Sequence, residues 1–274
     1  MKLKNHIITL PRTALLLAVS LAFTVISQGA FVSYYVGIDS LVNVASGTYA
    51  GLPNLNNGKL TFLYAHPSAT PATNHYHSKG LMRYTGLNLG AATATEASPH
   101  NHLPEGTRRL QLTIASSGGI YDGKRVVAPD AADSFSLLTI EDTGKLSGFA
   151  AGTSEAFMFN SSGGRWNGAL TGADVHLELV SLTSGLNVGD SSTLNLFSVP
   201  GDDLHLEDSF SFTPVFWTDA SAAPGDYTAV FKLTDESNTF GDSGNFEFRM
   251  TVIPEPSSAL LGAFGALALL RRKR

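Results

Sequence analysis

Histidine is the residue type whose spacing in this chain most clearly indicates chemistry. Two His-x-His pairs occur, His75/His77 and His100/His102. Alternate residues of an extended segment project to the same side, about 7 Å apart, so the two imidazoles of such a pair can converge on one ion. The spacing therefore predicts metal binding at both pairs, with His66 as an additional ligand.

Two His-x-Glu pairs lie further along the chain, His176/Glu178 and His205/Glu207. The leucine between the two members of each pair is expected to point into the core, which leaves the His and the Glu on the exposed face. Zinc accepts His nitrogen and Glu oxygen, usually from four ligands, and copper or nickel accepts the same nitrogen ligands. We therefore add His176, His205 and Glu207 to the candidate ligands, with zinc as the expected ion.

Each of these histidines also has an interpretation without a metal. The His-x-His pairs can belong to a solvated polar loop, and His176 and His205 can be ordinary residues on the wet face of a strand. A lone histidine would be read as a surface residue. Two pairs within a segment of 28 residues, from position 75 to position 102, favour the metal interpretation.

The segments that must position these side chains are short and separated by turns. Residues 109–114 and 245–250 alternate apolar and polar side chains, which is typical of a strand with one buried face. Turn-forming Gly, Asn, Asp and Ser cluster between the segments. Strands are expected at 34–43, 59–64, 109–115, 134–140, 156–159, 175–182, 193–199, 209–216, 227–233 and 245–253.

Many short strands at this spacing predict an all-β fold, an antiparallel β-sandwich formed by residues 31–252. No long amphipathic helix is expected within it. Residues 65–106 differ from the rest because they are rich in Ala, Thr, Pro and Asn and hold five histidines. We expect a long His-rich loop there, or a pair of loops around the short segment 80–89, and long loops in compact domains are usually functional or disordered.

Both ends of the chain have the pattern of export signals. Residues 1–30 combine a basic start, an apolar middle and small residues near the end, which predicts a secretory signal peptide removed by signal peptidase. Residues 253–274 hold Pro254, Glu255 and Pro256, then an apolar segment, then a basic cluster that begins with Arg271 and Arg272. Both apolar segments are shorter than the roughly 20 residues of a stable membrane span. We expect two flanking helices that engage the membrane transiently, with a permanent single-pass anchor as the alternative.

The tail resembles a PEP-CTERM sorting signal in the order of its three parts. The resemblance implies an exosortase as a partner and cleavage near the Pro-Glu-Pro motif. It also implies a location at the cell surface or in the extracellular matrix, where polysaccharide becomes a candidate partner.

Composition excludes several classes of protein. Without its two ends the chain holds 11 basic and 22 acidic residues, a net charge of −11, so nucleic acid is not an expected partner. Cations are plausible partners, with solubility alone as the alternative role of most of these acidic residues. The absence of cysteine excludes cysteine proteases and zinc ribbons. No nucleophile elbow, Walker loop, dinucleotide glycine fingerprint or His-Glu-x-x-His motif is present, and we do not expect an enzyme.

Two internal stretches resemble known surface proteins. The stretch 75–80, His-Tyr-His-Ser-Lys-Gly, and the stretch 200–212 with the following 224–228 resemble surface PEP-CTERM proteins repressed by the zinc-uptake regulator. The second stretch also resembles the His-x-His…Pro-Gly-x-Tyr module of anchored surface proteins that accompany metal ABC transporters. Glu207 stands where that module favours a second histidine. The resemblance implies a protein made when zinc is scarce.

The sequence therefore predicts an exported surface protein that binds zinc and scavenges or handles it under zinc limitation. A structural matrix or adhesion protein whose histidines are incidental is the main alternative. A metal-dependent hydrolase is a further alternative, since a zinc ion with three ligands and an open position can activate water.

Overall fold

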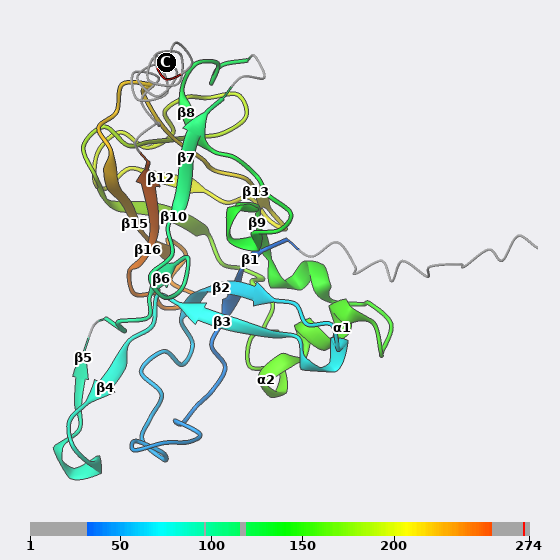
Figure 1. Ribbon diagram of the computed structural model, residues 1–274. Helices are drawn as coiled ribbons and strands as arrows, with labels where there is room; N and C mark the ends of the chain where they lie inside the picture. Colours follow the sequence, from blue (N-terminus) through cyan, green and yellow to red (C-terminus); the bar gives the residue numbers. More distant parts are fainter. Residues whose placement is uncertain (1–31, 96, 116–118, 254–270, 272–274) are drawn as a thin grey trace, which may run out of the picture.

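The computed structural model describes residues 32–95, 97–115, 119–253 and 271. Strands dominate these residues, and they form two large sheets and one small hairpin (Figure 1). The predicted signal peptide lies outside the described residues, and so does the predicted sorting tail apart from Ile253 and Arg271. Within the described ranges, no helix is long and apolar enough to cross a membrane.

The first sheet has five strands and positions most of the loop histidines. Its order is β13 (Ser211–Phe212), β9 (Ile140–Asp142), β1 (Tyr34–Ile38), β2 (Leu60–His66) and β3 (His75–Lys79). Strand β1 pairs antiparallel with β2 and parallel with β9, so the sheet is mixed. Strand β3 forms one edge of the sheet, which leaves its outer side open to other groups.

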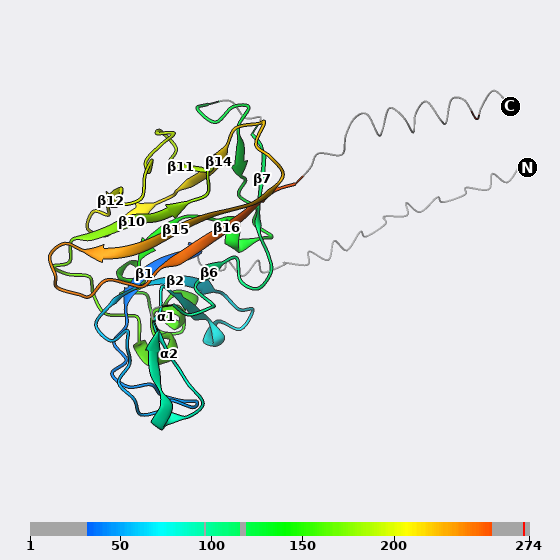
Figure 2. The same cartoon turned by 90° about the vertical axis from the view of Figure 1, so that its left-hand side faces the viewer.

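The second sheet has nine strands and curls into a half-barrel (Figure 2). Its main path is β11 (Asn187–Gly189), β14 (Val215–Thr218), β8 (Arg125–Val127), β7 (Leu110–Ile114), β16 (Phe246–Val252), β15 (Gly225–Asp235), β10 (Val175–Leu182) and β12 (Asp203–His205). Strand β6 (His102–Leu103) adds to β16 beside β7, and both pair with it in the parallel direction. Strand β12 forms the other edge.

The remaining elements are short. Strands β4 (Arg83–Thr85) and β5 (Thr93–Thr95) form a hairpin that projects away from both large sheets (Figures 1 and 2). The two α-helices are α1 (Ser154–Phe159) and α2 (Ser161–Gly164). Four 3-10 turns complete the fold: η1 (Pro71–Thr73), η2 (Leu89–Ala91), η3 (Ser134–Ser136) and η4 (Thr143–Leu146).

The two large sheets share one hydrophobic core. Phe62 of the first sheet stacks on Phe246 of the second with ring centroids 4.2 Å apart, and Tyr34 meets Phe248 at 5.5 Å. The alternation in β16 buries every second residue, which supplies Phe246 and Phe248 to this core. Burial of each such aromatic side chain contributes about 1.5–3 kcal/mol.

A smaller core covers the other face of the five-stranded sheet. Tyr35, Leu63 and Tyr76 pack there against Met158 of α1 and against Trp166. Because both faces are covered, the first six residues of β2 are all buried. The backbone that holds the histidines of β2 and β3 is therefore fixed from both sides.

The fold corrects several expectations. Residues 156–159 are helical, not extended, because Thr153 caps α1 by accepting a hydrogen bond from the Ala156 amide. Residues 193–199 hold no strand, only a bridge from Phe197 to Val188. The segment 65–106 is not one long loop, since it includes β3 to β6. Pairing is mixed and not purely antiparallel.

Candidate metal centre

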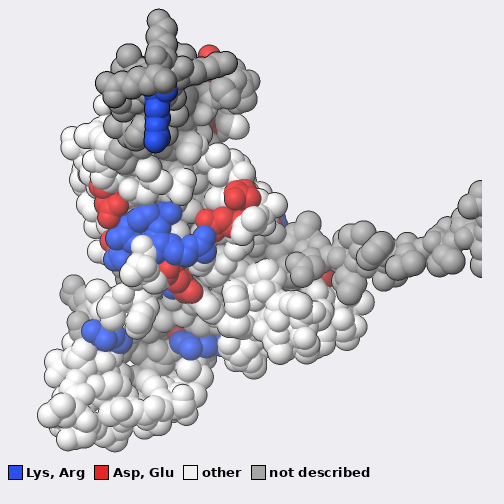
Figure 3. All heavy atoms as spheres, viewed as in Figure 1, with Lys and Arg blue, Asp and Glu red and all other residues white. Residues whose placement is uncertain are grey.

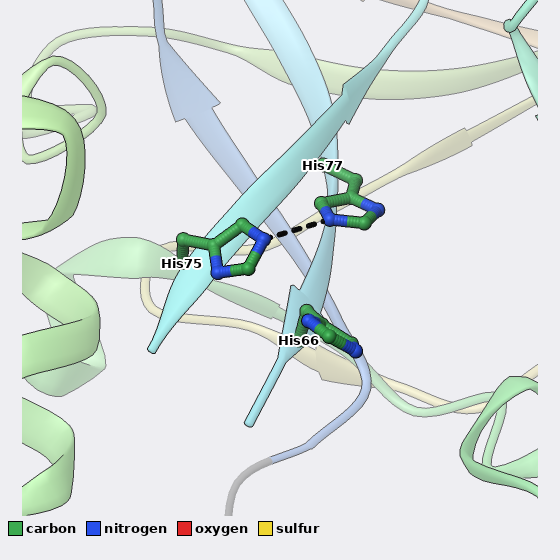
Figure 4. A group of neighbouring side chains, drawn as sticks. All are labelled: His66, His75 and His77. Atoms are coloured by element: carbon green, nitrogen blue, oxygen red, sulfur yellow. Dashed lines mark hydrogen bonds between the residues drawn. The ribbon is translucent and has the colours of Figure 1, made fainter. Parts of the chain in front are cut away.

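Three of the predicted ligands meet at the end of the β2–β3 pair. His66 is the last residue of β2 and lies directly opposite His75, the first residue of β3. His77 lies two residues further along β3 and so projects to the same side as His75. Figure 4 shows the three imidazoles turned toward one another. We name this group the three-histidine cluster.

The spacing of these rings suits a common ion. The ring centroids lie 5.0 Å apart for His66 and His75, 5.1 Å for His66 and His77, and 4.8 Å for His75 and His77. One ring nitrogen from each residue lies within 4.8 Å of the others, and the Nε2 atoms of His75 and His77 are 2.9 Å apart. Tetrahedral zinc with Zn–N bonds of about 2.0–2.1 Å places its nitrogens about 3.3 Å apart. That value lies between the 2.9 Å of the Nε2 pair and the 4.8 Å limit of the group.

Hydrogen-bond acceptors hold the other ring nitrogens of two of the histidines. The Nδ1 atom of His75 lies 2.9 Å from the carbonyl oxygen of Thr73. The Nδ1 atom of His77 lies 2.8 Å from the carboxylate of Glu105. A carbonyl or an ionised carboxylate can only accept, so both Nδ1 atoms carry hydrogen. A ring in this tautomer and without a second proton presents the lone pair of its Nε2 atom to the other ring.

Glu105 is itself fixed by a buried cation. Lys79 is 3% exposed and its Nζ donates to Glu105 at 2.6 Å and to the His100 carbonyl at 3.0 Å. Burial opposes ionisation of Glu105, but the hydrogen bonds from Lys79 and His77 outweigh it and lower the pKa of Glu105. The carboxylate is thus held ionised, as expected of an outer-shell partner of a metal-binding imidazole.

The cluster opens to solvent on one side. His66 is exposed, whereas His75 and His77 are half-buried. Burial and the neighbouring His77 and His75 lower the pKa of His66, so its imidazole tends to stay neutral and able to bind a metal. A cleft of about 460 Å³ lined by His66, Glu105 and aromatic side chains leads to the cluster.

A second group forms at the edge of the nine-stranded sheet. His176 of β10 lies directly opposite His205 of β12, and the two rings stack with centroids 5.0 Å apart. Asp174 lies against both rings, and Asp203 and Glu236 lie against His176. We name this set of five residues the two-histidine cluster.

Three predicted ligands lie outside both groups. His100 is exposed. His102 is the first residue of β6, where it pairs with Glu247 of β16, and its Nδ1 atom lies 2.9 Å from the carbonyl oxygen of Pro104. Among the described residues neither belongs to a metal-sized group. Glu207 approaches His205 only to 3.7 Å, and its side chain is 86% exposed.

Sequence reasoning missed the carboxylates of both clusters. Glu105 follows the His100/His102 pair closely, and Asp174 stands two residues before His176, which is again the i, i+2 spacing. The second spacing was a usable signal. Asp203 and Glu236 reach His176 only through the pairing of β12 and β15 with β10, which no local pattern specifies.

Comparison with known proteins finds no relative of this chain. No protein-family model, no curated protein and no solved structure matches the chain.

Proposed function

We propose that this protein binds zinc through His66, His75 and His77. One observation carries the proposal: the Nε2 atoms of His75 and His77 face each other at 2.9 Å while acceptors occupy both Nδ1 atoms. Two lone pairs at that distance repel unless a cation lies between or beside them. A proton between the two nitrogens removes this repulsion. A divalent metal ion removes it too and can also bind His66.

Zinc fits the set of donors better than a hard cation does. Three imidazole nitrogens without a carboxylate oxygen form a borderline-soft set that suits zinc, with copper and nickel as competitors, and does not suit calcium or magnesium. Three protein ligands leave the fourth tetrahedral position to water or to a ligand from the cleft. Such a site exchanges its ion more readily than a closed four-ligand site.

We propose a binding role and not a catalytic one. The carboxylates that line the cleft beside the cluster are Glu105 and Asp133. Glu105 is paired with Lys79 and His77, and Asp133 with Arg108 at 2.8 Å. Neither is left free to act as a general base on a metal-bound water.

The proposed setting is the cell surface under zinc limitation. The signal-like start, the Pro-Glu-Pro tail and the resemblance to zinc-responsive surface proteins support export, handling by an exosortase and a scavenging role. We also propose that the two large sheets are the layers of a single sandwich, which the shared Phe62, Phe246 and Phe248 core supports.

A titration of the purified protein with zinc near neutral pH tests the proposal. We expect the variant His75→Ala/His77→Ala to bind one zinc ion fewer per chain than the wild type. His100→Ala is the matched control, because His100 is exposed and lies outside both clusters. A wild-type number of bound zinc ions in the double variant would refute the site. Absence of zinc binding altogether would favour the matrix or adhesion interpretation.

A further inference from the structure

The two-histidine cluster repeats the design of the three-histidine cluster on the other sheet. In each, two histidines face each other directly across an antiparallel pair whose outer strand is a sheet edge: His66 and His75 on β2–β3, His176 and His205 on β10–β12. In each, an acceptor carboxylate holds the Nδ1 atom of one of the histidines, Glu105 for His77 and Asp203 for His176. This arrangement presents the Nε2 atom of His176 for coordination.

Oxygen and nitrogen atoms converge at that Nε2 atom. The Oδ1 atom of Asp174 lies 3.2 Å from Nε2 of His176 and 3.0 Å from Nε2 of His205. These three residues offer ligand atoms that all lie within 4.8 Å of one another. The Oε2 atom of Glu236 lies 3.8 Å from the same Nε2 atom of His176. The spacings are close to the roughly 3.3 Å between ligands of a tetrahedral ion with bonds near 2 Å.

Burial and charge support a bound cation. The His176 side chain is 11% exposed, whereas those of Asp174, His205 and Glu236 are 44%, 48% and 63% exposed. The group therefore has a fixed base and an open side through which an ion can enter. Among the described residues, Asp174, Asp203 and Glu236 form ion pairs only with histidines. With neutral imidazoles the group carries an uncompensated charge of about −3.

We infer that Asp174, His176 and His205 form a second site, which binds a divalent transition-metal ion through two nitrogen ligands and one oxygen ligand, with Glu236 beside His176. Asp203 is a positioning residue for His176. Mixed imidazole and carboxylate ligands accept zinc, and they accept manganese or ferrous iron better than three imidazoles do. The second site is independent of the three-histidine cluster, since the histidines of the two sites lie on different sheets.

Zinc stoichiometry of the full chain tests the inference. We expect two zinc ions per wild-type chain, and one after His205→Ala or Asp174→Asn. His205 and Asp174 are about half exposed, so these changes leave the core intact, which circular dichroism verifies. Loss of one ion in each variant, with the His100→Ala control unchanged, supports the site. Retention of two zinc ions in both variants would overturn the inference. It would also be overturned if the wild type bound a single zinc ion and His75→Ala/His77→Ala removed it.

Manganese separates the two sites further. We expect an immobilised Mn²⁺ signal in electron paramagnetic resonance that Asp174→Asn and His205→Ala abolish and His75→Ala/His77→Ala preserves. A manganese signal that depends only on His75 and His77 would contradict the inference. Failure of the three-histidine cluster alone leaves one zinc that depends on Asp174 and His205, so the two proposals fail independently.

Discussion

Glu105 offers the sharpest perturbation of the three-histidine cluster because it touches no proposed ion directly. Its carboxylate accepts the Nδ1 hydrogen of His77 at 2.8 Å and receives Lys79 at 2.6 Å. Removing it weakens the orientation and basicity of His77 while leaving all three ligands in place. Loss of such outer-shell partners typically costs 10–100-fold in metal affinity.

The two substitutions at Glu105 should differ in size. In Glu105→Gln the amide oxygen can still accept from His77, but as a neutral group, so we expect zinc affinity to fall about 10-fold, or about 1.4 kcal/mol. In Glu105→Ala no acceptor remains, and we expect a fall nearer 100-fold, or about 2.7 kcal/mol. Glu207→Gln is the matched control, because that carboxylate is exposed and far less engaged.

The assay is a competition titration against a chromophoric zinc chelator, with Glu105 variants built on Asp174→Asn so that a single site is measured. Both variants also leave the buried Lys79 without its carboxylate, so the free energy of unfolding in urea must be measured alongside. Affinities for zinc within twofold of the parent in folded Glu105→Ala protein would refute the proposed role of Glu105.

Three further outcomes follow from the same structure. His66→Ala should reduce zinc affinity less than His75→Ala, because His66 is exposed and no hydrogen bond fixes its ring among the described residues; equal losses in the competition titration would contradict this order. Metal-free wild type should exceed His176→Gln in stability most at about pH 5. Burial alone would lower the pKa of His176, but Asp203 and Glu236 outweigh it and raise that pKa. The stabilisation is therefore complete below the unfolded value of about 6.5 and disappears as pH rises through the folded value. If the difference in the free energy of unfolding between the wild type and His176→Gln, measured in urea, grew as pH rose, this prediction would be contradicted. Phe62→Ala should cost about 3–5 kcal/mol in the same measurement, because it opens the core between the two sheets, and a cost below about 1 kcal/mol would contradict that packing.

The sequence was informative where chemistry depended on local spacing. The i, i+2 rule predicted that His75 and His77 share a side, and β3 provides the extended backbone that the rule requires. The same rule did not bring His100 and His102 together. Between them Asn101 is buried and bonds the backbone of Leu81, and only His102 lies in a strand. That segment is shaped by a side-chain hydrogen bond that spacing cannot reveal.

Register and long-range pairing set the limit of sequence reasoning. The opposition of His66 to His75, and of His176 to His205, depends on how β2 meets β3 and how β10 meets β12. Glu236 is 60 residues from its histidine in the chain and reaches it through a third strand. The helix at 154–159 was missed for a different reason, since a short apolar run fits a strand or a helix, although Thr153 followed by Glu155 is a helix-start signal.

Anomalous diffraction at the zinc edge, from crystals of the protein grown with zinc, tests the central claim most directly. We expect a peak about 2.0–2.1 Å from the Nε2 atoms of His75 and His77 and within bonding reach of His66. Density that shows the three rings well ordered and no anomalous peak among them, at a zinc concentration that saturates binding in solution, would contradict it.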